Sequence, residues 1–141
     1  MKASLGLRGD GAELGRLLGF AEEFARRQSL PEAERSRLLI ILEELFTNTV
    51  KYGYPEGAAA AGRIEVGLAV TRGRLEIHFS DNGRPFDPLS HTPSGLDRPP
   101  AERPLGGLGL QLLRSLVDEA RYRRERGRNC LALVRNLGAP G

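Results

Sequence analysis

The sequence predicts an α/β (α+β) fold in which helices cover one face of a sheet, and three observations support this prediction. Apolar residues recur at helical spacing in two long segments near the N-terminus. They alternate with polar residues in shorter segments before and after these helices, and turn residues separate the alternating segments. The resulting order, β-α-α-β-β-α-β-β, predicts a two-layer sandwich with a mixed, mostly antiparallel sheet covered on one face by three helices.

The first three elements follow from periodicity and helix-start signals. Lys2 to Arg8 alternate weakly and predict an edge strand. An apolar stripe at helical spacing predicts a helix from about Ala12 to Arg27. Ser29 as N-cap, with Pro31 near the first turn, then predicts a second helix that runs to Tyr52.

The second half of the chain predicts two hairpins around a helix. Arg63 to Thr71 and Arg74 to Ser80 alternate and are joined by Arg72-Gly73, which indicates an antiparallel hairpin with one covered face. The segment of about 89–105 is rich in Pro, Ser and Asp and has almost no periodicity, which is typical of a lid or a disordered loop. The remaining predicted elements are a helix from about Gly107 to Asp118 and two strands, Ala120 to Glu125 and Asn129 to Val134, around Gly127-Arg128.

Length and composition bound the class of protein. The 141 residues predict one domain spanning 1–141, and the single cysteine, Cys130, excludes an internal disulfide and is expected to be a small buried residue. The formal net charge is +3, but no basic and aromatic motif accompanies it, so we expect no direct nucleic-acid binding. The longest apolar run, Leu38 to Leu42, is too short to cross a bilayer, and Asp10 and Glu13 exclude a signal peptide. We therefore expect a cytoplasmic protein without a membrane anchor.

Glu44 and Asn48 form the first of three polar motifs. They lie four residues apart in the second predicted helix, so their side chains emerge on the same face about one turn apart. A carboxylate beside an amide suits Mg²⁺, which takes hard oxygen ligands and is usually held by one or two protein oxygens together with phosphates. Glu43 points about 100° away around the helix. The same pair is typical of a solvated acidic helix face, and taken alone the segment favours that interpretation.

Asp81-Asn82-Gly83, at the end of the first hairpin, is the second motif. The carboxylate can accept a hydrogen bond from an exocyclic amine, and the glycine lets a ring lie close to the backbone. An ordinary turn is the alternative. The continuation Pro85-Phe86-Asp87-Pro88 leads into the long unpatterned segment instead of another strand, which favours a site, with Phe86 packed beneath it.

Gly106-Gly107-Leu108-Gly109 is the third motif and precedes the third predicted helix. A glycine-rich turn at a helix N-terminus exposes backbone N–H groups that bind phosphate oxygens. The motif lacks the Lys and Ser/Thr of a P-loop and does not match the dinucleotide fingerprint. A hinge for the preceding segment is the alternative interpretation.

With these motifs in this order, the chain resembles the GHKL superfamily of ATPases (Bergerat fold, histidine-kinase-like), and within it the anti-sigma-factor serine/threonine kinases. The resemblance spans nearly the whole chain. Glu44-Leu45-Phe46-Thr47-Asn48 resembles the N box, Asp81 to Pro88 the G1 box in its Phe-Asp-Pro form, and Gly106 to Leu110 the G2 box. Arg103 and the Gly127-Arg128-Asn129 turn also fit the pattern.

The resemblance implies ATP and Mg²⁺ as cofactors and assigns roles to the matching residues. Asn48 would be the Mg²⁺ ligand, Asp81 would recognise the adenine amine, and Gly83 would shape the adenine pocket. Glu44 would be the general base that activates the substrate hydroxyl. The other implied nucleotide-binding residues are Gly107, Leu108 and Gly109 at the phosphates and Thr47 and Arg103 near the γ-phosphate, with an ATP lid at about 89–105.

One position departs from the pattern. Many superfamily members have a second glycine two residues after Gly83, and Pro85 stands there in this chain. Proline fixes its own φ and lacks an N–H donor. We therefore expect a stiffer adenine loop.

The function implied by the resemblance is a protein serine/threonine kinase that acts as an anti-sigma regulatory factor in transcription. It would phosphorylate a serine on a STAS-type anti-sigma antagonist, sequester a sigma factor, and form a homodimer. The alternative is a non-enzymatic, nucleotide-gated protein-binding module, in which ATP only orders the lid. A detached histidine-kinase domain is disfavoured, because Glu44 accompanies Thr47 in the N box and no histidine-bearing dimerisation helix is visible.

Overall fold

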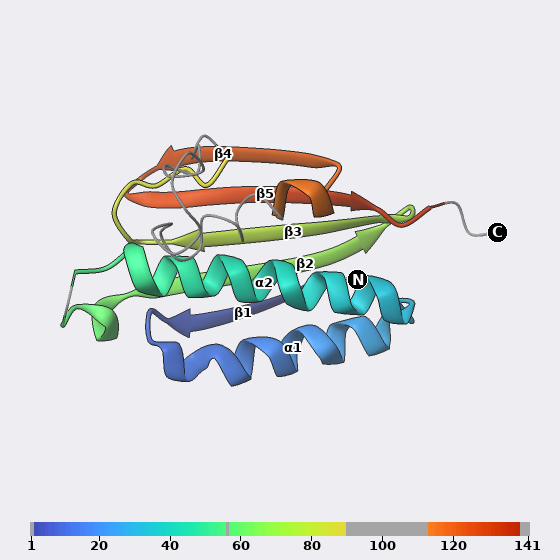
Figure 1. Ribbon diagram of the computed structural model, residues 1–141, viewed down its shortest axis with the longest axis horizontal. Helices are drawn as coiled ribbons and strands as arrows, with labels where there is room; N and C mark the ends of the chain where they lie inside the picture. The colour runs from blue at the N-terminus through green and yellow to red at the C-terminus, as the bar shows by residue number, and fades with distance from the viewer. Residues whose placement is uncertain (1, 56, 90–112, 139–141) are drawn as a thin grey trace, which may run out of the picture.

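In the described residues, 2–55, 57–89 and 113–138, five strands form a sheet in the order β1-β2-β3-β5-β4 (Figure 1). The structure is a computed structural model. Each pairing between neighbouring strands is antiparallel. The elements are β1 (Lys2–Arg8), η1 (Gly11–Glu13), α1 (Leu14–Arg27), α2 (Glu32–Tyr52), η2 (Ala59–Ala61), β2 (Arg63–Thr71), β3 (Arg74–Asp81), β4 (Glu119–Glu125) and β5 (Arg128–Asn136).

The two long helices lie side by side on one face of the sheet, and residues 113–116 add a short helical segment on the same face (Figure 1). This confirms the predicted two-layer α/β architecture. The part of the third predicted helix before residue 113 lies outside the described residues. The core between the layers consists of Leu17, Ala21, Phe24, Leu38, Ile41, Leu42, Leu45, Phe46, Ile64, Val66, Leu68, Leu75, Ile77, Phe79, Leu113, Leu131 and Leu133, with Leu7 at its edge.

The antiparallel pairing corrects one detail of the prediction, which was a mixed sheet. The segment between β3 and β4 joins two strands that run in the same direction, as a crossover connection does. These strands are not neighbours, because β5 returns through a hairpin and lies between them. Among the described strands, therefore, none pairs with a parallel neighbour.

Both hairpins close with two-residue turns in the left-handed region. Arg72 and Gly73 have φ of 52° and 74° and join β2 to β3 as predicted. Arg126 and Gly127 have φ of 51° and 77° and join β4 to β5. Such turns match the twist of antiparallel strands. The second turn lies one residue earlier than predicted, because β5 begins at Arg128.

The junction between the helices corrects the prediction that Ser29 caps α2. Ser29 has φ of 52°, and its N–H donates to the Arg26 carbonyl at 3.1 Å. The Leu30 N–H donates to the Ala25 carbonyl at 2.9 Å. This pair of bonds is the Schellman arrangement, which ends a helix with a left-handed residue that is usually glycine. Ser29 therefore ends α1, and Pro31 occupies the cap position of α2 without a side-chain bond.

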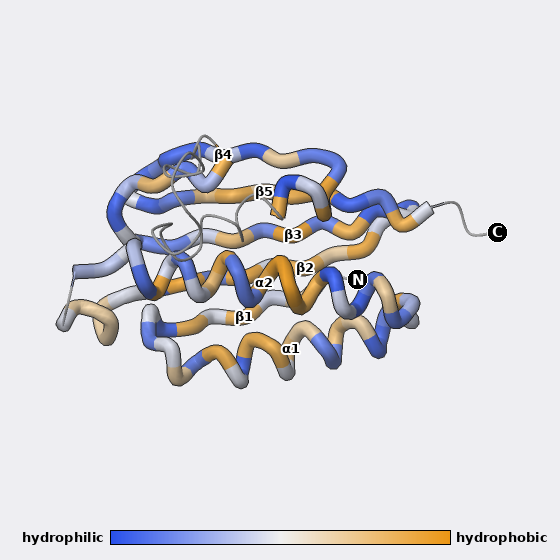
Figure 2. Tube along the Cα trace, in the orientation of Figure 1, coloured by the Kyte–Doolittle hydropathy of each residue, from blue (hydrophilic) through white to orange (hydrophobic). Residues whose placement is uncertain are grey.

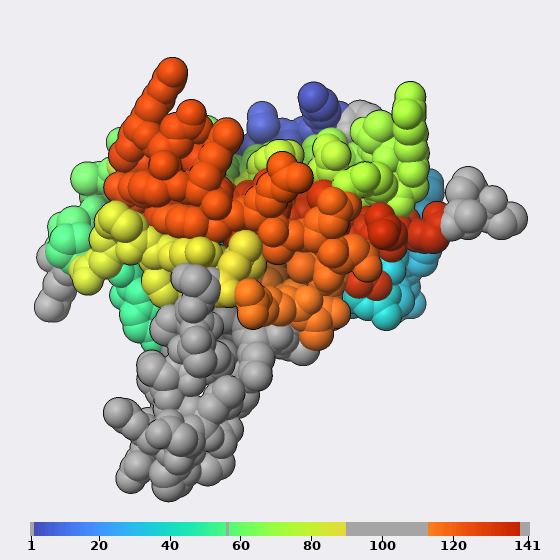
Figure 3. All heavy atoms as spheres, turned by 90° about the horizontal axis from the view of Figure 1, so that it is seen from above, coloured from blue at the N-terminus to red at the C-terminus, as the bar shows by residue number. Residues whose placement is uncertain are grey.

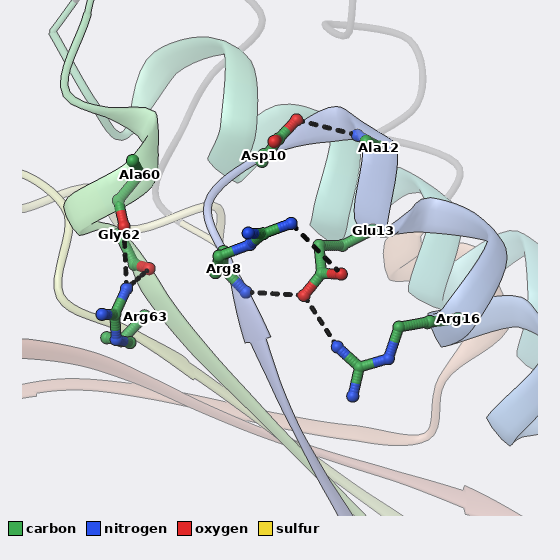
Figure 4. Close-up of polar contacts among 8 residues, drawn as sticks. All are labelled: Arg8, Asp10, Ala12, Glu13, Arg16, Ala60, Gly62 and Arg63. Carbon is green, nitrogen blue, oxygen red and sulfur yellow. Dashed lines mark hydrogen bonds and ion pairs between the residues drawn. The ribbon is translucent and has the colours of Figure 1, made fainter.

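The start of α1 is fixed by a buried carboxylate (Figure 4). Glu13 Oε2 accepts hydrogen bonds from the Arg8 backbone N–H at 3.0 Å and from Arg16 Nη1 at 2.8 Å. The bond from the Arg8 backbone, followed by that from Arg16, holds the pKa of Glu13 below its ordinary value. The short turn before α1 is itself capped by Asp10, whose Oδ1 accepts from the Ala12 N–H. These contacts tie the end of β1 to the start of α1, which begins two residues later than predicted.

The outer strand β4 differs from the rest of the sheet. Figure 2 shows it as largely hydrophilic, and all of its side chains except Tyr122 are exposed. Cys130, on β5, is half-buried and free, where the sequence predicted a buried residue. None of the helices in the described ranges is long and apolar enough to span a membrane.

Candidate functional site

A small cavity of about 30 Å³ lies where the C-terminal half of α2 faces β3, β5 and β4. Most of its lining is apolar, and the side chains of Asp81 and Asn129 form a polar floor. Asn48 and Asp81, which belong to different sequence motifs and different layers of the fold, line it together. The lining residues are Leu45, Asn48, Thr49, Gly53, Phe79, Asp81, Arg84, Phe86, Pro88, Tyr122, Asn129 and Leu131.

Asp81 is the acidic group of the floor. It is the last residue of β3, is 5% exposed, and continues the buried alternation of Leu75, Ile77 and Phe79. Its Oδ1 accepts from the Gly83 backbone N–H at 2.9 Å and from Asn129 Nδ2 at 2.9 Å. No described residue donates to Oδ2. One carboxylate oxygen is thus fixed by the protein and the other is left as an acceptor.

Asn129 stands beside Asp81 on β5 and is 6% exposed. Its Nδ2 donates to Asp81 Oδ1 and to the Arg84 carbonyl at 2.8 Å. Its Oδ1 accepts from the Phe86 N–H at 3.1 Å and from the Tyr122 hydroxyl at 2.6 Å. Sequence reasoning connected Asn129 only with the turn into the last strand. The signal that could have found its role is a polar residue in the inward-facing series that continues with Leu131 and Leu133.

The loop after β3 passes close to the end of α2. The Arg84 N–H donates to the Gly53 carbonyl at 2.8 Å. A Cβ on Gly83 would lie 2.7 Å from the Gly53 carbonyl oxygen and 2.9 Å from Asp81 Oδ1, so only glycine fits there. Arg124 Nη1 donates to the Gly83 carbonyl at 2.7 Å from the other side. Figure 3 shows this loop, in yellow, lying along the side of β4.

The hydroxyl groups of two tyrosines donate hydrogen bonds to asparagine side chains next to the cavity. The Tyr54 hydroxyl donates to Asn82 Oδ1 at 2.9 Å, and burial, followed by the charge of Asp81, raises the pKa of Tyr54. Burial likewise raises the pKa of Tyr122, whose hydroxyl donates to Asn129. Both phenols therefore stay protonated well above neutral pH. The Tyr54 ring lies against Gly9 and Gly62, where an added Cβ would come within 3 Å of it.

Glu44 and Asn48 contact each other on α2. Asn48 Nδ2 donates to the Glu44 carbonyl at 2.7 Å and to Glu44 Oε2 at 3.2 Å. Asn48 is 6% exposed and faces the cavity, whereas Glu44 is half-buried and is not one of the described residues that line it. No described residue donates to Asn48 Oδ1. The amide oxygen is therefore available to a ligand while the nitrogen holds the carboxylate.

The other predicted site residues are not brought to this cavity by the described structure. Thr47 is exposed on α2, and its neighbour Thr49 is the threonine that lines the cavity. Arg103 and Gly107, Leu108 and Gly109 lie outside the described residues, as does the predicted lid apart from Leu89. Within the described part of the chain, no three His, Cys, Asp or Glu side chains gather as a metal cluster.

Comparison with known proteins identifies the class to which this fold and site belong. Residues 7–135 match the family described as histidine kinase-like ATPase domain, and the chain belongs to this family. This confirms the superfamily resemblance predicted from the motifs. The described site supplies to such a domain the Asp81 carboxylate, the closely packed Gly83 and the Asn48 amide on α2.

Two similar proteins of this family are named as protein kinases. The serine/threonine-protein kinase BtrW of Bordetella bronchiseptica is 31% identical over 117 residues, which cover 83% of this chain and 81% of that protein. The serine-protein kinase RsbW of Bacillus cereus is 30% identical over 111 residues, which cover 76% of this chain and 68% of that protein.

Solved structures share the fold. A crystal structure of RsbU and RsbW domains from Mycobacterium tuberculosis superposes with a TM-score of 0.71 at 18% identity, and covers all of this chain. This chain spans 34% of that longer one. The catalytic domain of the histidine kinase ThkA gives a TM-score of 0.51 at 15% identity, over 96% of this chain and 97% of that domain.

Proposed function

We propose that this protein is an ATP-dependent protein serine/threonine kinase that acts as an anti-sigma regulatory factor. The observation that carries the proposal is the contact between Glu44 and Asn48, which places a carboxylate one helical turn from an amide that faces the cavity. The names of the two relatives at about 30% identity, both serine kinases, support the same reaction class. Glu44 is the residue that we assign as the base for the reaction.

The polar floor of the cavity is suited to recognition of the adenine base. Asp81 Oδ2 is an acceptor in an environment that is otherwise apolar on the side of Leu45 and Phe79, which suits the exocyclic amine of adenine. Arg84, whose side chain is exposed, also lines the cavity.

The residues present fit Mg²⁺ as the ion that accompanies the triphosphate. Asn48 Oδ1 is a hard oxygen without a donor among the described residues, and Mg²⁺ typically takes only one or two protein oxygens together with phosphates. Bound there, the ion would neutralise negative charge on the phosphates. Gly107, Leu108 and Gly109, together with Thr47 and Arg103, are proposed to hold the rest of the triphosphate.

The chemistry assigned to the chain itself is proton removal. In the proposed transfer, the substrate serine oxygen forms a bond to the γ-phosphorus, and the bond from that phosphorus to the β–γ bridging oxygen breaks, releasing ADP. Glu44 accepts the hydroxyl proton. Asn48 Nδ2 restricts the rotation of Glu44 by its bond to Oε2, so the carboxylate is positioned before the substrate arrives.

The proposed partners are proteins. The serine would lie on a STAS-type anti-sigma antagonist, and the second partner would be a sigma factor, with the kinase acting as a homodimer. Residues 1–141 would act as one ATPase domain with its lid at about 89–105. Because ATP is the phosphoryl donor, we place this activity in the cytoplasm.

Substitution of Glu44 tests the assignment. Glu44→Gln is expected to lower transfer of labelled phosphate from ATP to an antagonist protein by at least about 100-fold, because general-base catalysis contributes that much. ATP binding, measured by calorimetry, should stay within about threefold of the parent, since the amide keeps an oxygen for Asn48. Glu43→Gln, on the exposed neighbouring position, is the matched control and should transfer normally.

The same experiment separates the kinase from a nucleotide-gated binding module. A kinase yields phosphoserine on the antagonist, mapped by mass spectrometry, and loses it in Glu44→Gln. A module yields no phosphoprotein with either variant, while nucleotide still changes the affinity for its partner. Full transfer by Glu44→Gln would remove Glu44 from its assigned role.

A further inference from the structure

The side chain of Asn129 has all of its hydrogen-bonding capacity in use within the protein. A primary amide offers two donors and an oxygen with two acceptor sites. Both donors of Nδ2 are directed to groups that can only accept, the Asp81 carboxylate and the Arg84 carbonyl, and Oδ1 receives the Phe86 N–H and the Tyr122 hydroxyl. A flipped amide would place its NH₂ against the Phe86 N–H. The orientation is therefore fixed, and Asn129 has no polar group left for a ligand.

The bond between Asn129 and Asp81 joins strands β5 and β3 at the polar floor of the cavity. Asn129 and Asp81 are directly opposite each other on β5 and β3, so the amide and the carboxylate lie on the same face of adjacent strands. With Oδ1 of Asp81 held by both Asn129 and Gly83, the carboxylate cannot rotate without losing two bonds. Oδ2 is then the oxygen that faces an incoming group.

Asn129 also brackets Pro85. The Arg84 carbonyl and the Phe86 N–H, which flank this proline, both bond to the same side-chain amide. The amide thus pairs with the loop as a neighbouring strand would. Proline lacks an N–H of its own, so this pairing anchors the loop through the residues on either side of Pro85.

We propose that Asn129 is the positioning residue of base recognition: it fixes the Asp81 carboxylate so that a single acceptor oxygen faces the exocyclic amine of a 6-aminopurine. Tyr122 is its support, because its hydroxyl occupies one of the two acceptor sites of the Asn129 amide. The inference rests on the proposed ATP site and adds to it the residue that makes the site selective. Asn129 acts through Asp81 and touches no part of the nucleotide.

Selectivity between ATP and inosine triphosphate tests this role, because inosine carries a carbonyl oxygen where adenine carries the amine. Asn129→Asp keeps the shape of the side chain and its acceptor oxygen, but replaces the donor that holds Asp81 by a second carboxylate oxygen. ATP affinity should fall by about tenfold or more, the scale of one charge-assisted hydrogen bond. Inosine triphosphate, which makes no amine contact, should lose only the factor that the added negative charge imposes on both triphosphates. The dissociation constant of inosine triphosphate divided by that of ATP therefore falls.

Asn136→Asp, an exposed position on the same strand, is the matched control for the added charge and should leave the ratio unchanged. Tyr122→Phe provides a second variant should Asn129→Asp fail to fold. It removes one donor to the amide and should lower the same ratio by about threefold, a fraction of one hydrogen bond. Thermal unfolding of the nucleotide-free proteins reports folding independently.

Equal weakening of ATP and inosine triphosphate in Asn129→Asp would make Asn129 a merely structural residue and overturn the inference. If Asn129→Asp does not fold and Tyr122→Phe does, an unchanged ratio in Tyr122→Phe would also overturn the inference. Failure of the proposed function looks different, because the parent protein itself would then bind neither triphosphate or bind both equally.

Discussion

Arg135 binds both carboxylate oxygens of Glu34, a residue that lies 101 positions earlier in the chain. Nε lies 2.5 Å from Oε2 and Nη2 lies 3.0 Å from Oε1, and the remaining nitrogen, Nη1, donates to the Leu116 carbonyl at 2.8 Å. The side chains are 18% and 13% exposed. One guanidinium thus joins the start of α2, the end of β5 and the helical segment at residues 113–116.

The first prediction concerns this junction and pH. The hydrogen bond from Arg135 holds the pKa of Glu34 below its ordinary value of 4.5, so the unfolded chain binds the proton more readily than the folded protein. The stabilisation is therefore complete above about pH 4.5 and is lost as the pH falls through the lower pKa of the folded state. Arg135→Met should lower the free energy of unfolding at pH 7 by about 2 kcal/mol.

Urea unfolding between pH 7 and pH 3 measures this effect. The difference in stability between the parent and Arg135→Met should shrink as the pH falls below 4.5. Arg37→Met is the matched control, because Arg37 reaches the same Glu34 with one nitrogen from a more exposed position, and should cost about 0.5 kcal/mol. A difference that stays constant over this range would show that Glu34 is not the titrating partner.

The second prediction concerns the end of α1. Ser29 adopts the left-handed conformation, which costs a residue with a Cβ roughly 1–2 kcal/mol. Ser29→Gly should therefore raise the free energy of unfolding by about 1 kcal/mol, measured by urea denaturation. Ser36→Gly, at an exposed position inside α2, should lower it by a similar amount, because glycine is unfavourable in a helix interior. Stabilisation by both substitutions, or by neither, would contradict the Schellman assignment.

The third prediction concerns Gly83. An alanine Cβ would lie 2.7 Å from the Gly53 carbonyl, so Gly83→Ala must separate the loop from the end of α2 or turn Asp81. ATP affinity should fall by at least about tenfold, since the amine contact depends on Asp81. Gly6→Ala, in β1, meets open space and should bind ATP normally. Calorimetry on both variants checks this, and undiminished binding by Gly83→Ala would place the base elsewhere.

The predictable parts of the fold are those fixed by local rules. Alternation and a two-residue turn gave the hairpin of β2 and β3, because the register of such a hairpin follows from the turn and the buried face. The prediction that Ser29 caps α2 was wrong because two local preferences compete at this residue. Serine is common at helix starts, but here the backbone bonds of Leu30 and Ser29 to the preceding turn outweigh that preference.

The candidate site was predictable only in part. Asp81 and Asn48 belong to short motifs, and the structure brings both to one cavity. Tyr122 and Arg124 belong to no such motif, and the sequence connected Asn129 only with the turn into the last strand, because the roles of all three arise from strand pairing between segments distant in sequence. Only the pairing of β5 with β3 and β4 places an amide, a phenol and a guanidinium around the same loop.

The separation of Asp81 from Asn129 by 48 residues has a consequence for how this protein matures. A growing chain acquires α2, the first hairpin and Asp81 well before strand β5 exists, and domains are synthesised from the N-terminus. Until β5 pairs with β3, the Asp81 carboxylate and the Arg84 carbonyl lack the hydrogen bonds that Asn129 donates. Nucleotide binding stabilises only the state that contains the complete site. A nucleotide that binds the complete site therefore favours, by its binding free energy, the state in which β5 has paired with β3 and β4.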